Sequence, residues 1–548
     1  MRLPDDQELA TATIAAAHAA GITIFDTARA YGNERLIARA LASPAGLAGP
    51  AAARIATKGG MTRAGEAWVT DGRAKAIRAD CEASLVALEG LAIDLYLIHA
   101  PDPRTPWRTS LRALARLHDE RLVRHIGVSN INRPQLDEAL ALAPITAVQV
   151  PLNVYDDRAV RGGVVERCAE LGVTVMAHSP LGGPRRAASL ARHQGLAKVA
   201  RGRGATPAEI ALAWLLELSP VVVPIPGARR PETARSSAGA AALRLDAEER
   251  AALVRPQRAR RAARARADAD VLLVMGIPGA GKTRLARDYA ARGYVRLNRD
   301  ERGGGLRELA GVLDEALSAG AARVVLDNTY LTRAARSYVI EAARRHGTPP
   351  KCLWLDTSLA HAQANMVERV LERFGALPTP EEMRQIGRRE PGLLMPTSQM
   401  RALRELEPPS VDEGFAGVEV VRFERVNHAG RPRRAVIIAA PALRSREGWE
   451  HVPAGSDAPH LIFDWSPGGS ADALAPLIAR MAARVSGPLA AAVCPHPGGP
   501  PSCWCRPPLP GLPLAFAHKH QADPALLIGT TPTHRTLAAT VGADFVLI

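Results

Sequence analysis

A glycine-rich loop followed by lysine and threonine is the clearest chemical signature of this 548-residue chain. The loop has the spacing Gly276-x4-Gly281-Lys282-Thr283, between an apolar run, VLLVM, and a helical pattern. Glycines let backbone N–H groups close around phosphate oxygens at a helix N-terminus. The lysine then reaches the outer phosphates, and the threonine hydroxyl binds Mg²⁺. The sequence therefore predicts a strand–loop–helix site for ATP and Mg²⁺, with these contacts: Gly276, Gly279, Gly281, Lys282 and Thr283.

Four polar residues in the first half of the chain stand at or just after the ends of apolar runs: Asp26, Tyr31, Lys58 and His99. They lie in the segments FDTARAYGNE, ATKGG and LIHAPDP, and GVSN, the run with Gln149, SPLGG and VPIPGARRPE follow in order. With these signatures the chain resembles the aldo-keto reductase family through nearly all of residues 10–250. The resemblance implies that the four residues are catalytic. The alternative is four unconnected polar residues at strand ends.

The residue types suit the reduction of a carbonyl group by hydride transfer, the reaction that the resemblance implies. The developing oxyanion needs a proton, and a free tyrosine has a pKa near ~10. By the resemblance Tyr31 is the general acid, and the ammonium of Lys58 lowers the pKa of that phenol by stabilising the phenolate. Asp26 holds the ammonium of Lys58, and His99 orients the carbonyl oxygen.

The resemblance also implies NADPH, bound without a Rossmann fold. The implied contacts are Ser129, Asn130 and Gln149 near the carboxamide, Ser179 and Leu181 near the pyrophosphate, and Gly227, Arg229 and Arg230 near the adenosine phosphate. His178 stands where the family often places an aromatic side chain under the nicotinamide ring. Arg230 either binds a 2′-phosphate by charge or is a solvated loop arginine.

The chain departs from that family at the start of the barrel. Seven apolar runs alternate with Ala-rich helical stretches, which indicates parallel βαβ units and a closed (β/α) barrel. The runs cover residues 22–28, 54–60, 93–100, 124–130, 147–153, 173–180 and 221–227. The family has an earlier strand with a Gly-x-Gly-Thr-like segment, before the helix that begins here near Asp6. One explanation is that the start of the reading frame was assigned too far downstream. The other is that two barrel edges are unpaired and the domain is a non-catalytic scaffold or partner surface.

Segments after the phosphate loop indicate what the nucleotide is used for. RGYVRLNRDE places Asp300 at a strand end, RVVLDNTYLTRAARSYV contains Asp327, and a helix expected over 360–374 carries Arg369 and Arg373. With DEGF (412–415), these segments resemble the kinase domain of 5′-polynucleotide kinases over about residues 270–425. The resemblance implies that Asp300 is the base for a 5′-hydroxyl and that Arg369 or Arg373 contacts the transferring phosphate. Asp327 would support the site from the second strand end.

Two alternatives stay open for this kinase. Asp300 could cap the N-terminus of a helix instead of acting as a base. The phosphate acceptor could be a small molecule, because the loop predicts phosphoryl transfer more directly than it predicts the acceptor.

Three of the six cysteines lie within twelve residues near the C-terminus. With one histidine they suit a closed tetrahedral zinc site, formed by Cys494, His496, Cys503 and Cys505. Unrelated cysteines in a Pro- and Gly-rich loop are the alternative. The segment resembles the zinc-bearing branch of the haloacid dehalogenase-like phosphatases.

The same resemblance implies that this phosphatase-like segment has lost its chemistry. The first strand should end in a nucleophilic aspartate, and the run AVIIAAPAL has Ala439 and Ala440 there. The family lysine falls on Leu509, and the Gly-Asp that holds Mg²⁺ becomes Gly529 and Thr530. No phosphoryl-enzyme can form from alanine, so a structural, inactive domain is expected.

The elements that must position these residues fall into three α/β segments. We expect a TIM-type (β/α) barrel that lacks its first strand over residues 1–254, a P-loop NTPase α/β domain over 270–428 and a Rossmann-like α/β domain over 429–548. Residues 255–269, within RPQRARRAARARADAD, are basic and Ala-rich without an apolar face. They form either a linker or an arm that binds nucleic acid.

The overall charge is strongly basic, at +15 with a sequence pI near 10.1. Only six of the 70 basic residues are lysines, so the charge indicates either a nucleic-acid partner or a compositional bias toward arginine. Where arginine is the habitual cation, a lysine marks a place that needs a compact ammonium. Lys58 and Lys282 are two of the six.

Composition sets the broad class of protein. Apolar residues make up 47% and charged residues 23%, which excludes a disordered or collagen-like chain. The absence of a run of ~18 apolar residues, and a start (MRLPDDQELA) unlike a signal peptide, predict a cytoplasmic protein with no membrane partner.

The leading hypothesis is an NADPH-dependent reductase of a small carbonyl substrate, fused to an ATP-dependent kinase of RNA or DNA 5′ ends and a module with structural zinc. The alternative joins a non-catalytic barrel to a small-molecule kinase.

Overall fold

The computed structural model describes residues 6–42, 52–65, 67–253, 269–390, 392–422, 433–452 and 454–548. The chain divides into two compact units, Met1–Arg261 and Ala262–Ile548. The stretch expected to be a basic linker, 255–269, lies outside the described residues except for its last position. In the part that the structure describes, no helix has both the length and the apolar character needed to cross a membrane.

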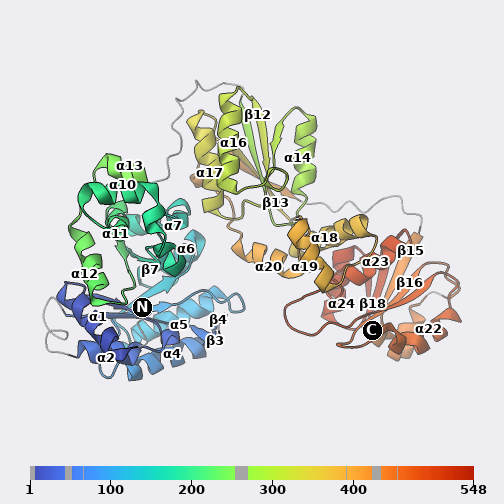
Figure 1. The fold of residues 1–548 in the computed structure, drawn as a ribbon. Helices are drawn as coiled ribbons and strands as arrows, with labels where there is room; N and C mark the ends of the chain where they lie inside the picture. Colours follow the sequence, from blue (N-terminus) through green and yellow to red (C-terminus); the bar gives the residue numbers. More distant parts are fainter. Residues whose placement is uncertain are drawn as a thin grey trace. The chain divides into compact units, whose positions relative to one another are not determined.

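The first unit, drawn in blue to green in Figure 1, is built on one parallel sheet. Its strand order is β1-β2-β5-β6-β7-β8-β9. Each apolar run overlaps one of its strands, and β7 begins two residues before the run at 147–153, so all seven predicted strands are confirmed. The strands are β1 Ile24–Asp26, β2 Arg54–Gly59, β5 Leu95–Ile98, β6 His125–Ser129, β7 Ile145–Pro151, β8 Thr174–His178 and β9 Val222–Pro224. A separate antiparallel hairpin consists of β3 Met61–Ala64 and β4 Ala67–Thr70.

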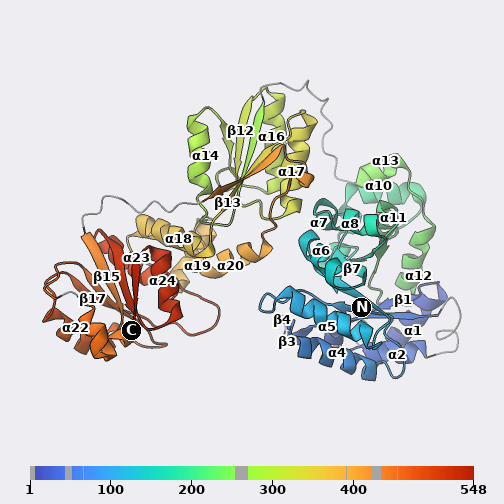
Figure 2. The same ribbon diagram turned by 180° about the vertical axis from the view of Figure 1, so that it is seen from behind.

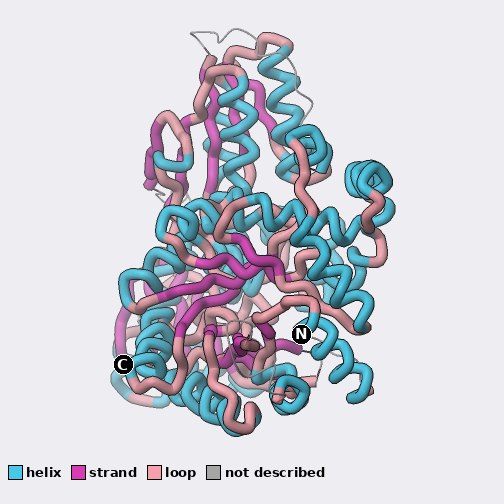
Figure 3. Tube along the Cα trace, turned by 90° about the vertical axis from the view of Figure 1, so that its left-hand side faces the viewer, coloured by secondary structure: helices cyan, strands magenta, loops and turns pink. Residues whose placement is uncertain are grey.

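Helices follow the strands of this sheet and lie around it (Figure 3). Their starts are encoded locally: Asn132 with Gln135, and Thr206 with Glu209, form capping boxes that satisfy the first backbone N–H groups. The helices are α1 Gln7–Ala19, α2 Glu34–Leu41, α4 Ala74–Ala87, α5 Trp107–Asp119, α6 Arg133–Leu142, α7 Arg158–Arg161, α8 Val164–Leu171, α9 Gly183–Ala187, α10 Gln194–Arg203, α11 Pro207–Leu218, α12 Pro231–Gly239 and α13 Ala247–Leu253.

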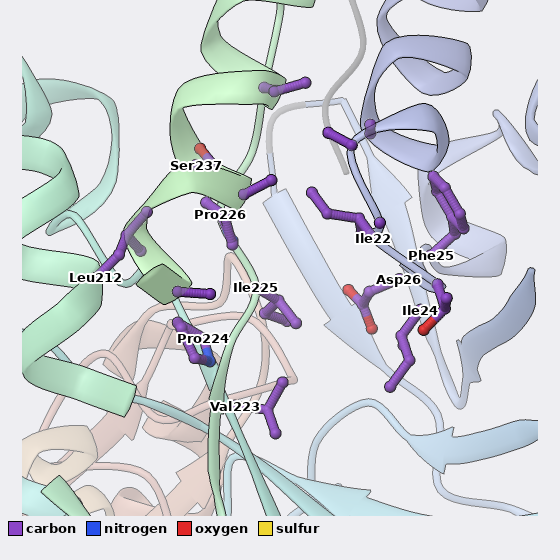
Figure 4. Close-up of a pocket in the computed structure, with 18 of the residues that line it drawn as sticks. Ile22, Ile24, Phe25, Asp26, Leu212, Val223, Pro224, Ile225, Pro226 and Ser237 are labelled. Atoms are coloured by element: carbon purple, nitrogen blue, oxygen red, sulfur yellow. The ribbon is translucent and has the colours of Figure 1, made fainter. Parts of the chain in front are cut away.

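The barrel stays open between its first and last strands. Among the described residues, no strand pairs with the outer edge of β1 or of β9. A cavity of about 360 Å³ separates the two edges, with Ile24 on the β1 side and Val223 and Ile225 on the β9 side (Figure 4). Helices α1 and α12 pack together beside this cavity. The expected lack of a first strand therefore corresponds to a real gap in the sheet.

The second unit begins with a parallel sheet in the order β11-β12-β10-β13-β14. Its strands are β10 Asp270–Met275, β11 Val295–Leu297, β12 Arg323–Asp327, β13 Lys351–Asp356 and β14 Gly417–Arg422. Its helices are α14 Lys282–Ala291, α15 Arg299–Arg302, α16 Leu306–Ser318, α17 Arg333–Arg345, α18 Leu359–Phe374, α19 Pro380–Arg389 and α20 Pro396–Glu405. Helix α18 confirms the helix expected over 360–374.

A second parallel sheet in this unit has the order β17-β16-β15-β18-β19. Its strands are β15 Arg433–Ala439, β16 His460–Trp465, β17 Leu489–Cys494, β18 Ala522–Gly529 and β19 Asp544–Leu547, and its helices are α21 Arg446–Glu450, α22 Ala475–Ala482, α23 Gly511–Lys519 and α24 Pro532–Val541. Alternate residues of β15 enter different cores: Ile437 faces one and Ile438 the other. Both faces of this sheet are therefore covered, as is usual for parallel sheets.

Candidate functional site

The structure brings the four predicted reductase residues to one end of the first sheet. Asp26 ends β1, Lys58 is next to last in β2, and His99 directly follows β5. Tyr31 ends a short 3-10 helix, η1 Arg29–Tyr31, that follows β1. The C-terminal ends of parallel strands meet at one face of a barrel, so residues distant in sequence converge there.

A buried ion pair forms the base of this site. The Nζ of Lys58 donates to both carboxylate oxygens of Asp26 at 2.8 Å and to the carbonyl of Thr27 at 2.6 Å. All three ammonium protons are thus used, and the lysine side chain is completely buried. Burial lowers the pKa of Lys58 and the carboxylate of Asp26 opposes that shift. Burial is the largest influence on Asp26 and by itself would raise its pKa. The charge of Lys58, together with the hydrogen bonds from Lys58 and Gln149, leaves that pKa below its usual value.

Tyr31 lies between this ion pair and two further rings. The Nζ of Lys58 is 5.6 Å from the centre of the phenol ring, and the imidazole of His99 meets that ring edge-on at 5.7 Å. Trp68 contacts both rings: its ring centre lies 6.1 Å from that of Tyr31 and 6.0 Å from that of His99. The cation, the phenol and the imidazole therefore form one cluster.

Sequence reasoning missed Trp68. It lies on β4 of the hairpin that follows β2, and its side chain is 42% exposed. The signal was available, because only 4% of this chain is aromatic and this tryptophan lies ten residues after Lys58. Trp68 forms an apolar wall beside the phenol.

His99 is held in its neutral form. It is 8% exposed, and its Nδ1 is buried without a hydrogen-bond partner among the described residues. Burial, and secondarily the positive charge of Lys58, lower the pKa of His99 to about 3. A neutral imidazole can donate a hydrogen bond to a carbonyl oxygen without carrying a charge.

Five of the residues predicted to contact the cofactor lie together on neighbouring strand ends. Asn130 Nδ2 donates to Ser129 Oγ at 3.1 Å, and Asn130 Oδ1 is 3.0 Å from Nε2 of His178, whose Nδ1 is 3.2 Å from Ser179 Oγ. Gln149 differs from the others because its Nε2 donates to Asp26 at 2.8 Å. Gln149 therefore supports the ion pair as well as lining the site.

The other predicted cofactor contacts do not share this network of hydrogen bonds. Gly227 is exposed and lines the cavity between β1 and β9. Arg229 and Arg230 are exposed just ahead of α12, and Leu181 is partly buried. Arg229 and Arg230 give positive charge to the exposed segment ahead of α12.

The phosphate loop predicted between β10 and α14 has the required backbone. Gly276 has a φ of 150° and Gly279 a φ of 86°, conformations that favour glycine. A Cβ at Gly276 would lie 2.9 Å from the carbonyl oxygen of Leu355, and one at Gly279 would collide with that of Ala362. Gly281, with a φ of 93°, is the N-cap of α14, whose first residue is Lys282. The glycines are therefore needed both for conformation and for close packing.

Lys282 is the central charge of the second site. Its Nζ donates to the carbonyl of Ile277 at 2.9 Å. Burial lowers the pKa of Lys282 to about 8, with Arg369 acting in the same direction, while Asp327 and Asp300 oppose the shift. Three predicted residues thus act electrostatically on this lysine. Arg373 instead is 64% exposed and pairs with Glu390 at 3.4 Å, so Arg369 is the better candidate for contact with phosphate.

Asp300 is not a helix cap. Asn298 caps α15, because its Oδ1 accepts hydrogen bonds from the N–H groups of Asp300 at 2.8 Å and Glu301 at 3.2 Å. The Asp300 carboxylate is 44% exposed and pairs with Arg299 at 3.1 Å. The alternative in which Asp300 serves as the cap is therefore wrong, and its carboxylate is accessible to an acceptor.

Asp327 is held from two sides at the end of β12. Arg296 donates to the carboxylate of Asp327 at 2.6 Å, and Asn298 donates to the same carboxylate from its Nδ2 at 3.1 Å. The side chain of Asp327 is 2% exposed. Glu413 of DEGF makes a comparable buried pair with Arg336, at 2.6 Å and 2.7 Å. Glu413 is thus a structural anchor for the segment before β14.

The predicted metal ligands form one cluster. The nearest ligand atoms of Cys494, His496, Cys503 and Cys505 all lie within 4.8 Å of one another. The sulfur of Cys494 is 3.8 Å from that of Cys503 and 3.4 Å from that of Cys505, and Nδ1 of His496 is 3.2 Å from the sulfur of Cys505. In a tetrahedral zinc site with Zn–S distances of ~2.3 Å, two sulfur ligands lie about 3.8 Å apart. The donor set and its spacing therefore fit Zn²⁺.

Comparison with known proteins defines the class of the first unit. The sequence profile of the aldo/keto reductase family matches residues 2–255, and that of an AAA domain matches residues 271–391. The first unit is thus an oxidoreductase barrel of the aldo/keto reductase class, and the second contains a P-loop nucleotide-binding domain.

Individual relatives agree with the family match. An uncharacterized oxidoreductase of Schizosaccharomyces pombe is 31% identical over 250 residues, 45% of this chain and 78% of that protein. A probable aldo-keto reductase of Glycine max is 32% identical over 259 residues, 42% of this chain and 73% of that protein. The crystal structure of a thermostable aldo-keto reductase has 33% identity, covers 46% of this chain and 90% of its own, and has a TM-score of 0.40. The chain belongs to the aldo/keto reductase family.

Proposed function

We propose that the first unit reduces a small carbonyl substrate with NADPH as hydride donor. The observation that carries this proposal is the Lys58 ammonium, fixed by Asp26 and 5.6 Å from the centre of the Tyr31 ring. A fixed positive charge stabilises phenolate, so Tyr31 can release its proton to a developing oxyanion near neutral pH. The neutral imidazole of His99 donates a hydrogen bond to the same oxygen and orients it.

The residues around this cluster suit NADPH. Ser129, Asn130 and Gln149 present hydroxyl and amide groups that match a carboxamide, and Arg229 and Arg230 supply charge for a phosphate. His178 would lie under the nicotinamide ring, and Ser179 and Leu181 along the pyrophosphate. When bound, NADPH supplies the hydride. Trp68 then covers the substrate and excludes water from the phenol.

Oxidation of NADPH tests this proposal. The full chain is mixed with NADPH or NADH and a panel of aliphatic and aromatic aldehydes, and loss of reduced cofactor is followed by absorbance. We expect turnover with NADPH, and weaker turnover with NADH because Arg229 and Arg230 would lose a phosphate partner. A folded protein that binds NADPH but reduces no aldehyde would favour the scaffold alternative.

For the second unit we propose an ATP-dependent kinase that phosphorylates a 5′-hydroxyl polynucleotide end. Supporting this are a phosphate loop around Lys282, the accessible carboxylate of Asp300, and Arg369 near that lysine. Lys282 and Arg369 would contact the phosphates of ATP, and Thr283 would hold Mg²⁺. Asp300 would accept the proton of the attacking hydroxyl. The net charge of +15 favours a polyanionic acceptor.

Transfer of labelled phosphate tests the kinase and its acceptor. The full chain receives γ-labelled ATP with 5′-hydroxyl RNA or DNA, or with a panel of small hydroxyl compounds. Asp300→Asn should keep ATP affinity and reduce transfer roughly 10²-fold or more, the usual scale for a general base. Asp288→Asn, on the exposed face of α14, is the matched control and should behave as wild type. Label in small compounds alone would favour the small-molecule alternative.

We further propose that the C-terminal sheet is a phosphatase-like module with structural zinc and no phosphatase activity. Ala439 ends β15 and Thr530 directly follows β18, and they offer neither a carboxylate nucleophile nor a carboxylate ligand for Mg²⁺. Cys503→Ser should release about one equivalent of zinc from the purified chain. A wild-type protein with no bound metal would contradict the zinc assignment.

A further inference from the structure

Helix α18 holds the phosphate loop along one of its faces. Asn365 Nδ2 donates to the carbonyl of Gly279 at 2.8 Å. Gln399 of α20 donates from its Nε2 both to the carbonyl of Pro278 at 2.8 Å and to that of Ala362 at 2.9 Å. Gln399 is completely buried, so it ties the loop, α18 and α20 together without access to water. The position of the loop therefore depends on the position of α18.

The other face of α18 belongs to the core of the C-terminal module. Four of its apolar side chains, at most 1% exposed, lie in one cluster with the sheet and helices of that module: Ala364, Val367, Val370 and Leu371. Helix α18 contacts both α23 and α24 (Figure 2). The module residues in the same cluster include Leu514 and Phe516 of α23 and Leu537 and Val541 of α24. A helix of the nucleotide-binding domain thus completes the layer that covers this sheet.

The loop with the four metal ligands reaches the same cluster. Trp504 stands between Cys503 and Cys505, is 3% exposed and packs in the core that contains α18. A Cβ at Gly511, the first residue of α23, would lie 2.9 Å from Leu377, three residues beyond the end of α18. The side chain between two thiol ligands is therefore part of the surface on which α18 rests.

We propose that the metal-binding loop sets the nucleotide affinity of the phosphate loop by fixing α18 in place. A metal bound by the four ligands would hold Trp504 in the core, Trp504 and its neighbours hold α18, and Asn365 of α18 holds Gly279. The module is then a support for nucleotide binding in place of a second catalytic unit. This inference rests on the proposed nucleotide site and zinc site.

The coupling has a thermodynamic consequence that can be measured in the unmodified chain. If metal raises nucleotide affinity by some factor, nucleotide must raise metal affinity by the same factor. Couplings between sites typically amount to about 5-fold to 150-fold. Competition against a chromophoric chelator therefore should show at least a 5-fold gain in zinc affinity with saturating MgADP. Chelator titrated with the same MgADP but no protein corrects for zinc bound by the nucleotide.

Two tryptophans of one module provide a matched pair of variants. Trp504 faces the core shared with α18, whereas Trp449, 5% exposed, packs in the core on the opposite face of the same sheet. Trp504→Ala should weaken MgATP binding at least ~5-fold by calorimetry on the full, zinc-loaded chain. Trp449→Ala removes as much apolar volume and should change that affinity less than about 2-fold.

The outcomes separate this inference from the proposals on which it depends. Equal MgATP affinities in both variants, or a zinc affinity that MgADP does not change, would overturn the coupling alone. A wild-type chain that binds no MgATP would overturn the nucleotide site, and one that holds no zinc would overturn the metal site. Either result would overturn the coupling with it.

Discussion

At the scale of single residues, the reductase site depends on charges that the fold buries in pairs. Lys58 donates all its protons to Asp26 and Thr27, and Gln149 supports the same carboxylate. Burying one such charge without its partner costs several kcal/mol. The ion pair and its hydrogen bonds are therefore already formed in the absence of substrate.

Replacing Tyr31 with phenylalanine removes the proposed acid and little else. The phenol proton is needed only as the oxyanion develops, so we expect loss of carbonyl reduction with NADPH affinity nearly unchanged. Steady-state rates and fluorescence titration of NADPH measure the two effects separately. Wild-type turnover by Tyr31→Phe would exclude Tyr31 as the acid.

The neutral His99 should make the first unit sensitive to acid. The pKa of His99 is lowered from 6.5 to about 3, so between these values the unfolded state binds more protons than the folded state. Stability is therefore fully present above pH 6.5 and is lost as pH falls, by up to ~1.4 kcal/mol per pH unit for this group. Thermal unfolding of wild type and His99→Asn at pH 7 and pH 5 checks this. The variant should lose less stability than wild type, and equal losses would contradict the neutral, buried assignment.

The functional residues could be predicted where they belong to motifs with a recognisable spacing and order along the chain. The resemblance to the aldo-keto reductase family, which rests on motifs in the right chain order, predicted the cluster of Asp26, Tyr31, Lys58 and His99. The sequence did not distinguish Asn298 from Asp300 as the cap of α15, because both types cap helices and lie two positions apart. Only the hydrogen bonds to Asn298 show which one does so.

At the scale of elements, strands were predicted well and contacts between distant elements were not. Buried parallel strands read as continuous apolar runs, and each of the seven runs of the first unit overlaps one. Helix α18 reads as an ordinary helix with an apolar face. That its two faces belong to different cores depends on α23 and α24, more than 130 residues further along the chain. No local pattern encodes such a partner.

The gap between β1 and β9 predicts that this barrel can bind one more strand. Its walls are apolar, with Ile24 on one edge and Val223 and Ile225 on the other, and both edges belong to a parallel sheet. An extended peptide of about five apolar residues should fill it and raise the melting temperature of the first unit, at roughly 2–4 °C per kcal/mol of stabilisation. Calorimetry with and without the peptide measures the shift.

A peptide with proline at alternate positions is the control, because proline lacks the N–H group that pairs with a sheet edge. It should not stabilise the first unit. Equal shifts from both peptides, or none from either, would show that the cavity is not a strand site.

At the scale of the whole molecule, the two proposed catalytic sites lie in two separate units of one chain. The reductase groups lie within Met1–Arg261, and the phosphate loop lies within Ala262–Ile548. The two proposed activities should therefore be separable by single substitutions. Lys282→Arg suits this purpose because it retains the charge, yet a planar guanidinium is too broad for a loop that encloses a compact ammonium.

The most direct test measures both activities in the same preparations of wild type, Tyr31→Phe and Lys282→Arg. NADPH-dependent aldehyde reduction and transfer of labelled phosphate to a 5′-hydroxyl oligonucleotide are assayed in parallel. Wild type should show both activities, Tyr31→Phe should retain only phosphate transfer, and Lys282→Arg should retain only reduction. A wild type with neither activity, or substitutions that each abolish both, would contradict the assignment of two chemistries to these two sites.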